Sequence, residues 1–248
     1  MLELQHISFS AEGKGILDDV SLEISDRFVA VTGPNGGGKS TLAKVIMGIE
    51  KPDSGRILLD GEDITDLSIT ERANRGISYA FQQPVRFKGL QVKDLLKIAA
   101  GRDTSINDAC SVLSEVGLCA RDYIDRELNA TLSGGELKRI EIAMALERGT
   151  KMTIFDEPEA GIDLWSFQNL IRVFEKMYEQ TRGSILIISH QERILDIADK
   201  IIYIKNGIVE QYGDRETVLP LLLSGGAAGS DGCKMLNDKF IGSKTGDN

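Results

Sequence analysis

The chain has 248 residues, of which 42% are hydrophobic and 27% are charged, a balance that predicts a globular protein with one large domain. The formal net charge of −9 argues against a nucleic-acid partner, because nucleic-acid-binding proteins usually carry a basic face. The longest apolar runs, such as 219–223, are too short to cross a bilayer, and the first ten residues show no secretory signal. Cys110, Cys119 and Cys233 lack metal-ligand spacing and fit a reducing compartment. We therefore expect a cytoplasmic protein without direct membrane insertion.

Strand patterns dominate the first sixty residues, at 20–24, 28–33 and 56–61, with a helical pattern at 39–48 that a glycine ends. Two helical patterns follow at 92–100 and 106–117. Strands return at 152–156 and 185–189 on either side of a helix around 164–180, and Asn206-Gly207 predicts the tight turn of a hairpin over 201–212. The second helical pattern places five apolar side chains on one face: Ile106, Ala109, Cys110, Leu113 and Val116.

Residues 33–40, with the sequence GPNGGGKS, fit the phosphate-loop pattern and stand between a buried strand and a helix, as that pattern requires. Glycines let backbone N–H groups converge on phosphates at the N-terminus of a helix. We expect Lys39 to reach the β- and γ-phosphates and Ser40 to reach Mg²⁺. The alternative is an ordinary glycine-rich turn before a helix. The succession of strand, loop and helix favours the phosphate loop over that alternative. The expected nucleotide contacts are Gly33, Pro34, Asn35, Gly36, Gly37, Gly38, Lys39, Ser40 and Thr41.

Two carboxylates, Asp156 and Glu157, follow a second buried strand in the sequence MTIFDEP. A carboxylate at such a strand end lies beside the phosphate loop and can hold Mg²⁺, which predicts this role for Asp156. Glu157 is then placed to polarise the attacking water. Taken alone, the pair fits an acidic strand end before a proline turn equally well.

The sequence LSGGELKR at 132–139 contains a capping box, because Ser133 precedes Glu136 by three residues and opens an amphipathic helix. Capping does not explain Gly134 and Gly135 at the first two helical positions, since glycine disfavours a helix by about 1 kcal/mol in its interior. Bare backbone at a helix N-terminus suits an anion that must approach closely.

These motifs, in this order, resemble those of the ATP-binding cassette (ABC) ATPases, over residues 2 to about 220. The resemblance implies ATP and Mg²⁺ as cofactors and an α/β fold: a P-loop NTPase core with an antiparallel β subdomain and a small inserted α-helical lobe. The ATPase domain would span 1–222, with the lobe at about 84–148, followed by a flexible Gly/Ser-rich tail at 223–248. Ala11 stands near the position where the family usually has an aromatic that stacks on adenine.

The resemblance also implies residue roles. Gln82 in YAFQQP matches the Q-loop glutamine, which senses Mg²⁺ and the γ-phosphate, and Asp163 in AGIDL matches the D-loop aspartate of the dimer interface. His190 matches the switch histidine, although a lone histidine at a strand end is usually structural. The expected catalytic residues are Glu157, His190 and Gln82. The expected metal-binding residues are Ser40, Gln82 and Asp156. In an ATP-dependent homodimer, the nucleotide of the partner subunit would contact Ser133, Gly134, Gly135, Glu136 and Asp163.

Two classes of ABC protein compete, the ATP-binding subunit of a membrane transporter and a cassette that drives a soluble scaffold. Residues 71–90, 132–142 and 189–195, and the non-aromatic Ala11, look like the SufC-type ATPases of iron–sulfur cluster assembly. This resemblance favours a SufB/SufD-like β-helical partner that docks near Pro84–Leu90. The chain from Gln82 to Ser133 is shorter than in bacterial SufC, which fits a reduced, minimal assembly system. The transporter subunit remains the alternative.

Overall fold

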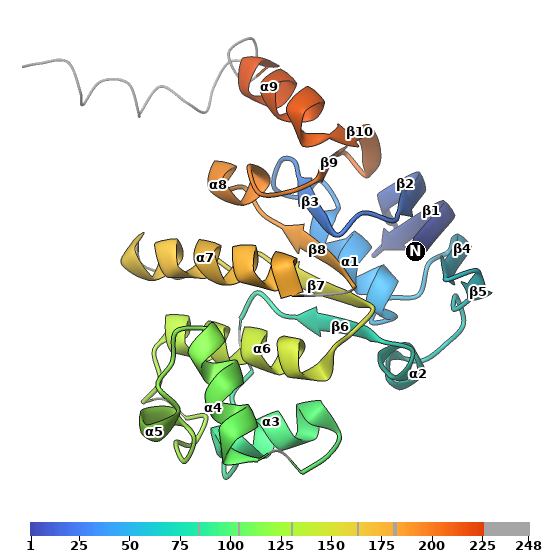
Figure 1. Cartoon of the computed structure of the whole chain (residues 1–248). Helices are drawn as coiled ribbons and strands as arrows, with labels where there is room; N and C mark the ends of the chain where they lie inside the picture. Colours follow the sequence, from blue (N-terminus) through green and yellow to red (C-terminus); the bar gives the residue numbers. More distant parts are fainter. Residues whose placement is uncertain (84, 104, 130, 163, 181–182, 226–248) are drawn as a thin grey trace, which may run out of the picture.

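A computed structural model describes residues 1–83, 85–103, 105–129, 131–162, 164–180 and 183–225 of the chain. Its main element is a six-stranded sheet in the order β10-β9-β3-β8-β7-β6 (Figure 1), in which β10 pairs antiparallel to β9 and the other pairs are parallel. The strands of this sheet are β3 (Phe28–Thr32), β6 (Ile77–Ala80), β7 (Met152–Asp156), β8 (Ser184–Ile188), β9 (Lys200–Lys205) and β10 (Ile208–Asp214).

The central strands are buried on both faces, which explains why their sequences are continuous apolar runs. In β3, Phe28 and Ala30 belong to one hydrophobic cluster, which also contains residues of the helical lobe. Val29 and Val31 belong to a second cluster, which lies against α1 and the smaller sheet. The alternation of the strand therefore divides its side chains between two cores.

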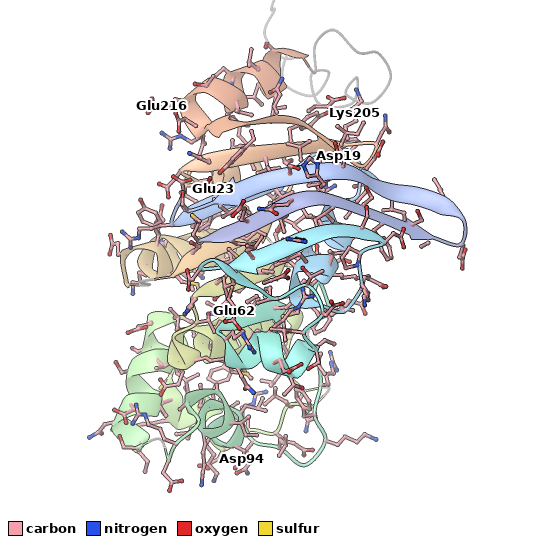
Figure 2. All side chains as sticks on the ribbon, turned by 90° about the vertical axis from the view of Figure 1, so that its right-hand side faces the viewer. Asp19, Glu23, Glu62, Asp94, Lys205 and Glu216 are labelled. Atoms are coloured by element: carbon pink, nitrogen blue, oxygen red, sulfur yellow. The ribbon has the colours of Figure 1, made fainter. Side chains whose placement is uncertain are left out.

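The smaller sheet is antiparallel, with the strand order β2-β1-β4-β5. Figure 2 shows it from its outer side, where acidic side chains such as Asp19 and Glu23 stand on the solvent face of β2. Alternate residues of β2, Val20, Leu22 and Ile24, are buried, so the sheet covers the core with one face. Its strands are β1 (Leu2–Ala11), β2 (Lys14–Ile24), β4 (Ser54–Leu59) and β5 (Glu62–Asp63).

Four helices, α3 to α6, gather beside the β6 edge of the large sheet, whereas α1 lies between the two sheets and α7 lies on the opposite face (Figure 1). The α/β core, the antiparallel subdomain and the inserted helical lobe predicted from the sequence are thus confirmed. The helices are α1 (Lys39–Met47), α2 (Ile69–Asn74), α3 (Val92–Ala100), α4 (Ile106–Glu115), α5 (Ala120–Tyr123), α6 (Gly134–Arg148), α7 (Leu164–Gln180), α8 (Glu192–Leu195) and α9 (Arg215–Gly225).

Two expectations about local structure need correction. Ile106 is 74% exposed and does not share the buried face of α4, because it begins the helix in a solvent-exposed turn that Ser105 and Asp108 cap. The last helix, α9, continues to Gly225, three residues into the segment predicted to be a flexible tail at 223–248. The rest of that segment, including Cys233, lies outside the described residues. Among the helices within the described ranges, none is long and apolar enough to cross a membrane.

Candidate functional site

The predicted phosphate loop connects β3 to α1 and packs against the turn of the β9–β10 hairpin. A Cβ on Gly33 would lie 1.9 Å from the carbonyl oxygen of Ile204, and one on Gly37 would lie 3.0 Å from the same atom. Gly207, in the predicted hairpin turn, donates its N–H to the Gly37 carbonyl at 3.0 Å. The loop thus needs glycine for its own packing, and its bare backbone leaves a cradle that suits phosphate groups.

Lys39, the first residue of α1, is 5% exposed. Its Nζ donates to the carbonyl oxygens of Gly33 at 2.8 Å and of Pro34 at 3.0 Å, so the side chain folds back across the loop. Burial lowers the pKa of Lys39, and the charges of Glu157 and Asp156 oppose this shift. An anion in the cradle would therefore meet a partly desolvated cation.

Ser40, the next residue, reaches the end of β7. Its Oγ donates to Oδ1 of Asp156 at 2.9 Å. A hydroxyl and a carboxylate are oxygen donors of the kind that Mg²⁺ prefers in phosphate-binding sites. Within the described residues, no group of three or more His, Cys, Asp or Glu side chains could hold a metal ion by itself.

The expected catalytic residues follow three neighbouring strands, because β6, β7 and β8 lie side by side in the large sheet. The side-chain amide of Gln82 donates to Oε2 of Glu157 at 2.5 Å. His190 Nε2 lies 3.5 Å from Oε1 of the same carboxylate. Two residues that are distant from Glu157 in the sequence therefore bracket its carboxylate from both sides.

The backbone of Glu157 has φ 44°, a left-handed conformation that costs a non-glycine residue about 1–3 kcal/mol. The residue is held there because its N–H donates to the Ile188 carbonyl at 3.0 Å and its own carbonyl accepts from Ala160 at 3.0 Å. Strain of this kind is found at functional sites, where the surrounding structure imposes it. The turn places the carboxylate between the strand ends.

The imidazole of His190 is a titratable group of the site that lies close to both Glu157 and Lys39 in its electrostatic surroundings. Burial and the positive charge of Lys39 lower the pKa of His190, and Glu157 opposes this shift. The ring is therefore neutral at pH 7, and one of its nitrogens can accept a hydrogen bond.

The predicted capping box at the start of α6 is confirmed. Glu136 N–H donates to Ser133 Oγ at 3.3 Å, and Ser133 N–H donates to Oε2 of Glu136 at 2.6 Å. A Cβ added to Gly134 would lie 3.8 Å from the nearest atom, the carbonyl oxygen of Gly161. The packing of the chain itself therefore does not require glycine at this position. The glycine remains available for a close approach from outside.

The carboxylate of Glu136, expected to serve a nucleotide, is engaged within the lobe. It accepts from Tyr123 Oη at 2.5 Å and lies 3.5 Å from Arg126. Burial acts in the opposite direction, but the hydrogen bonds from Tyr123 and Ser133 lower the pKa of Glu136 to about 2. Its side chain therefore stabilises the helix start. The capping box uses the backbone N–H groups of Ser133 and Glu136, which leaves those of Gly134 and Gly135 for any anion. Asp163 lies outside the described residues.

Two further polar residues of the site have no recognisable sequence motif. Tyr79 donates its hydroxyl to Oδ2 of Asp156 at 2.7 Å. Glu159 accepts from the hydroxyl of Ser189, beside His190, and burial raises the pKa of the Glu159 carboxyl. Glu159 could have been noticed as a third carboxylate in the sequence DEPE, but nothing in the spacing of Tyr79 indicates its contact with Asp156.

Comparison with known proteins identifies the family of the chain. Residues 17–160 match the family described as "ABC transporter". The chain is 39% identical to an uncharacterized ABC transporter ATP-binding protein of Methanocaldococcus jannaschii, over 88% of this chain and 90% of that protein. It is also 32% identical to a sulfate/thiosulfate import ATP-binding protein of Bacillus cereus. That alignment covers 88% of this chain but 62% of the importer subunit, which is less than two thirds of its length.

The fold is that of solved ABC cassettes. A dimeric ATP-binding cassette in a post-hydrolysis state, bound to ADP and Pi, superposes with a TM-score of 0.75 at 24% identity, over 87% of this chain and 99% of that one. At that identity the likeness shows the fold alone, whereas the family match and the archaeal relative concern the sequence itself. The chain therefore belongs to the ABC transporter family and is an ABC-type, ATP-binding ATPase.

Proposed function

We propose that this ATPase hydrolyses Mg²⁺-bound ATP with Glu157 as general base and works as one subunit of a larger assembly. The observation that carries the proposal is the convergence of Gln82 and His190 on the Glu157 carboxylate. Lys39 and the loop N–H groups bind the phosphates. Ser40, Asp156 and Gln82 hold the metal, which when bound neutralises charge on the phosphates. Glu157 orients the water and accepts its proton, and His190 contacts the γ-phosphate.

The second part of the proposal is an ATP-dependent, head-to-tail homodimer. Among the described residues, no hydrogen bond or ion pair joins the 133–136 segment to the phosphate loop, so one chain presents two half-sites. Gly134 and Gly135 offer bare N–H groups that the γ-phosphate of a partner subunit can approach. The solved cassette with the same fold is a dimer with bound ADP and Pi, which supports this arrangement.

The first candidate for the assembly is a membrane ABC transporter, with this chain as its ATP-binding subunit. The names of the relatives favour this reading, since they are ATP-binding proteins of transporters. The relative that aligns over 90% of its length is uncharacterized, whereas the sulfate/thiosulfate importer subunit aligns over 62%. The partial alignment therefore does not assign the importer's substrate, sulfate or thiosulfate, to this chain.

The second candidate is the soluble SufB/SufD-like scaffold of iron–sulfur cluster assembly. It is supported by the resemblance of residues 71–90, 132–142 and 189–195 to SufC-type ATPases. In both candidates the ATPase needs a surface that receives a separate protein beside the nucleotide site.

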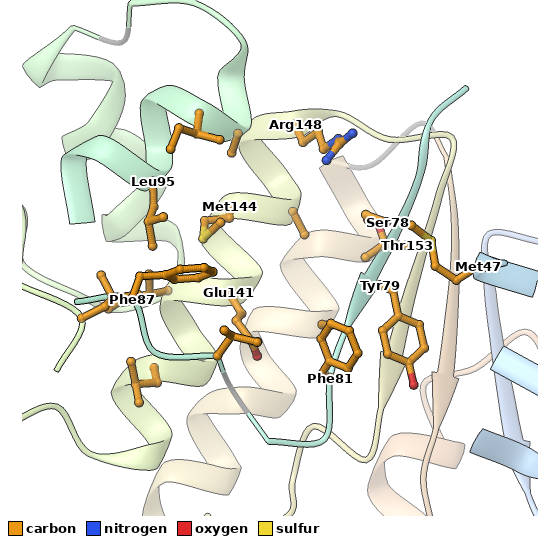
Figure 3. A pocket seen from close by; sticks show the side chains of 18 of the residues that line it. Met47, Ser78, Tyr79, Phe81, Phe87, Leu95, Glu141, Met144, Arg148 and Thr153 are labelled. Atoms are coloured by element: carbon orange, nitrogen blue, oxygen red, sulfur yellow. The ribbon is translucent and has the colours of Figure 1, made fainter. Parts of the chain in front are cut away.

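An apolar groove beside Gln82 fits that requirement. A cavity of about 300 Å³ opens between β6, α3 and α6 (Figure 3). Four of the large apolar side chains that line it are exposed, with Phe81 at 43%, Val85 at 44%, Phe87 at 40% and Ile98 at 64%. Exposed aromatic side chains of this kind are typical hot spots of protein interfaces. Pro84, part of the expected docking segment Pro84–Leu90, lies outside the described residues.

The experiment compares affinity purification from the soluble fraction without detergent and from detergent-solubilised membranes, using wild type, Phe87→Ala and the control Ile106→Ala. Ile106 is also exposed but does not line the groove. Phe87→Ala should weaken the complex by about 2 kcal/mol or more, whereas the control should not. An integral membrane permease as the bound protein supports the transporter, and a soluble β-helical protein supports the scaffold. Equal binding by both variants would contradict the docking surface.

A further inference from the structure

Tyr79 contacts both the proposed magnesium site and the apolar groove. Its hydroxyl donates to Oδ2 of Asp156 at 2.7 Å, while Ser40 donates to Oδ1 of the same carboxylate at 2.9 Å. Each oxygen of Asp156 thus accepts one hydrogen bond. A carboxylate fixed on both oxygens has little freedom to rotate, so its orientation depends on both donors.

The ring of Tyr79 lines the apolar groove. Figure 3 shows it on the strand side of the cavity, together with Phe81, and opposite Phe87 and Leu95 on the side of the helical lobe. The rings of Tyr79 and Phe81 meet edge to face, with centroids 4.8 Å apart and an interplanar angle of 74°. Phe81 is half-exposed at the rim, where a bound partner can reach its ring. Because the two rings are in contact, a displacement of the Phe81 ring also changes the packing of Tyr79.

We propose that Tyr79 is a positioning residue for the Asp156 carboxylate and that its contact with Phe81 makes this carboxylate respond to occupation of the groove. A partner that rotates Phe81 shifts the Tyr79 ring and with it the hydroxyl that holds Asp156. The inference rests on the proposed magnesium site. It adds a route from the docking surface to the metal-binding carboxylate that does not pass through Gln82.

The first test measures the dissociation constant of a non-hydrolysable ATP analogue with Mg²⁺ and with EDTA. Tyr79→Phe keeps the ring and removes the hydroxyl. It should reduce the gain in affinity that Mg²⁺ provides by about tenfold, the effect of losing a hydrogen bond to a charged group. The affinity in EDTA should stay within about twofold. An unchanged Mg²⁺-dependent gain in this variant overturns the positioning role.

The matched control is Tyr178→Phe. Tyr178 Oη also donates to a carboxylate, Asp199, at 3.0 Å, but Asp199 binds the N–H of Phe28 at the start of β3, at the opposite end of the sheet. This variant should leave both affinities unchanged. If it reduced the Mg²⁺-dependent gain as much as Tyr79→Phe, a general loss of packing would replace the proposed role.

The second test is a double-mutant cycle on the same readout. Phe81→Ala removes the edge contact but leaves the Tyr79 hydroxyl, and we expect a smaller loss, about threefold. Residues that act through one another are not additive, so Tyr79→Phe combined with Phe81→Ala should lose no more than Tyr79→Phe alone. Independent, multiplied losses would overturn the link from the groove to Asp156.

Asp156→Asn separates failure of this inference from failure of the magnesium site. If Asp156→Asn leaves the Mg²⁺-dependent gain unchanged, the proposed magnesium site is wrong and the inference falls with it. If Asp156→Asn abolishes the gain and Tyr79→Phe does not reduce it, the magnesium site stands and the inference alone is refuted.

Discussion

The replacement Glu157→Gln tests the centre of the proposed mechanism with the smallest change of shape. In the structure Oε2 of Glu157 accepts the amide of Gln82 at 2.5 Å, and Oε1 lies 3.5 Å from His190. A glutamine can keep the hydrogen bond from Gln82 through its oxygen, but its amide cannot accept a proton from water. The substitution therefore removes the base and leaves the surrounding contacts almost intact.

The expected loss is large for catalysis and small for binding. Removal of a general base typically lowers the rate about 10²–10⁴-fold, which corresponds to about 3–5 kcal/mol of transition-state stabilisation. The proposed phosphate contacts of Lys39 and the loop N–H groups, and the proposed contact of Ser40 with the metal, do not involve Glu157. The affinity for ATP should therefore change by less than about threefold, and the ATP-bound dimer should accumulate because it is no longer hydrolysed.

The assay is phosphate release in single turnover, with ATP affinity and particle size measured on the same samples. Glu159→Gln is the matched control, because Glu159 is the nearby carboxylate that accepts from Ser189 and a glutamine can still accept that bond. The control should lose less than about tenfold in rate. Glu157 could not be the base if Glu157→Gln retained a tenth or more of the wild-type rate. The same would hold if the rate fell further in Glu159→Gln than in Glu157→Gln.

Three further outcomes follow from the site. Gly33→Ala should weaken ATP binding at least tenfold, because its Cβ would lie 1.9 Å from the Ile204 carbonyl oxygen. The control is Gly13→Ala, which is also at positive φ but has nothing within 4 Å of its Cβ. It should cost about 1–2 kcal/mol of stability and leave the ATP affinity measured by titration unchanged. Since burial and Lys39 lower the pKa of His190, its ring should stay neutral until the pH falls below its usual pKa of about 6.5. The hydrolysis rate should then fall only below that pH, and this fall should be absent in His190→Gln. If His190→Gln showed the same fall at low pH, another group would be responsible for it. GTP should compete within about tenfold to a hundredfold of ATP, because Ala11 cannot provide stacking of about 1–3 kcal/mol, and strict ATP preference in a competition titration would indicate another stacking residue.

The sequence by itself determined the parts of the protein whose geometry is local. The loop at 33–38 needs glycine at 33, 37 and 38, where a Cβ would lie within 3.0 Å of a backbone carbonyl oxygen. Ser133 with Glu136 specifies a capped helix start, as the structure shows. Asn206-Gly207 predicted a turn with two positive-φ residues, which have φ 52° and 80°. Such patterns are readable because the interacting groups lie within a few residues of each other.

What only the tertiary structure decided is which distant side chains meet. The pairing of β6 with β7 and of β7 with β8 brings Gln82 and His190 to Glu157 and the Tyr79 hydroxyl to Asp156. The register of these strands is set by the apolar packing of both sheet faces, and a shift of one residue would turn each side chain to the other face. The same packing left Ile106 exposed and turned the Glu136 carboxylate toward Tyr123, neither of which periodicity predicts, because periodicity gives the face of a helix but not what covers it.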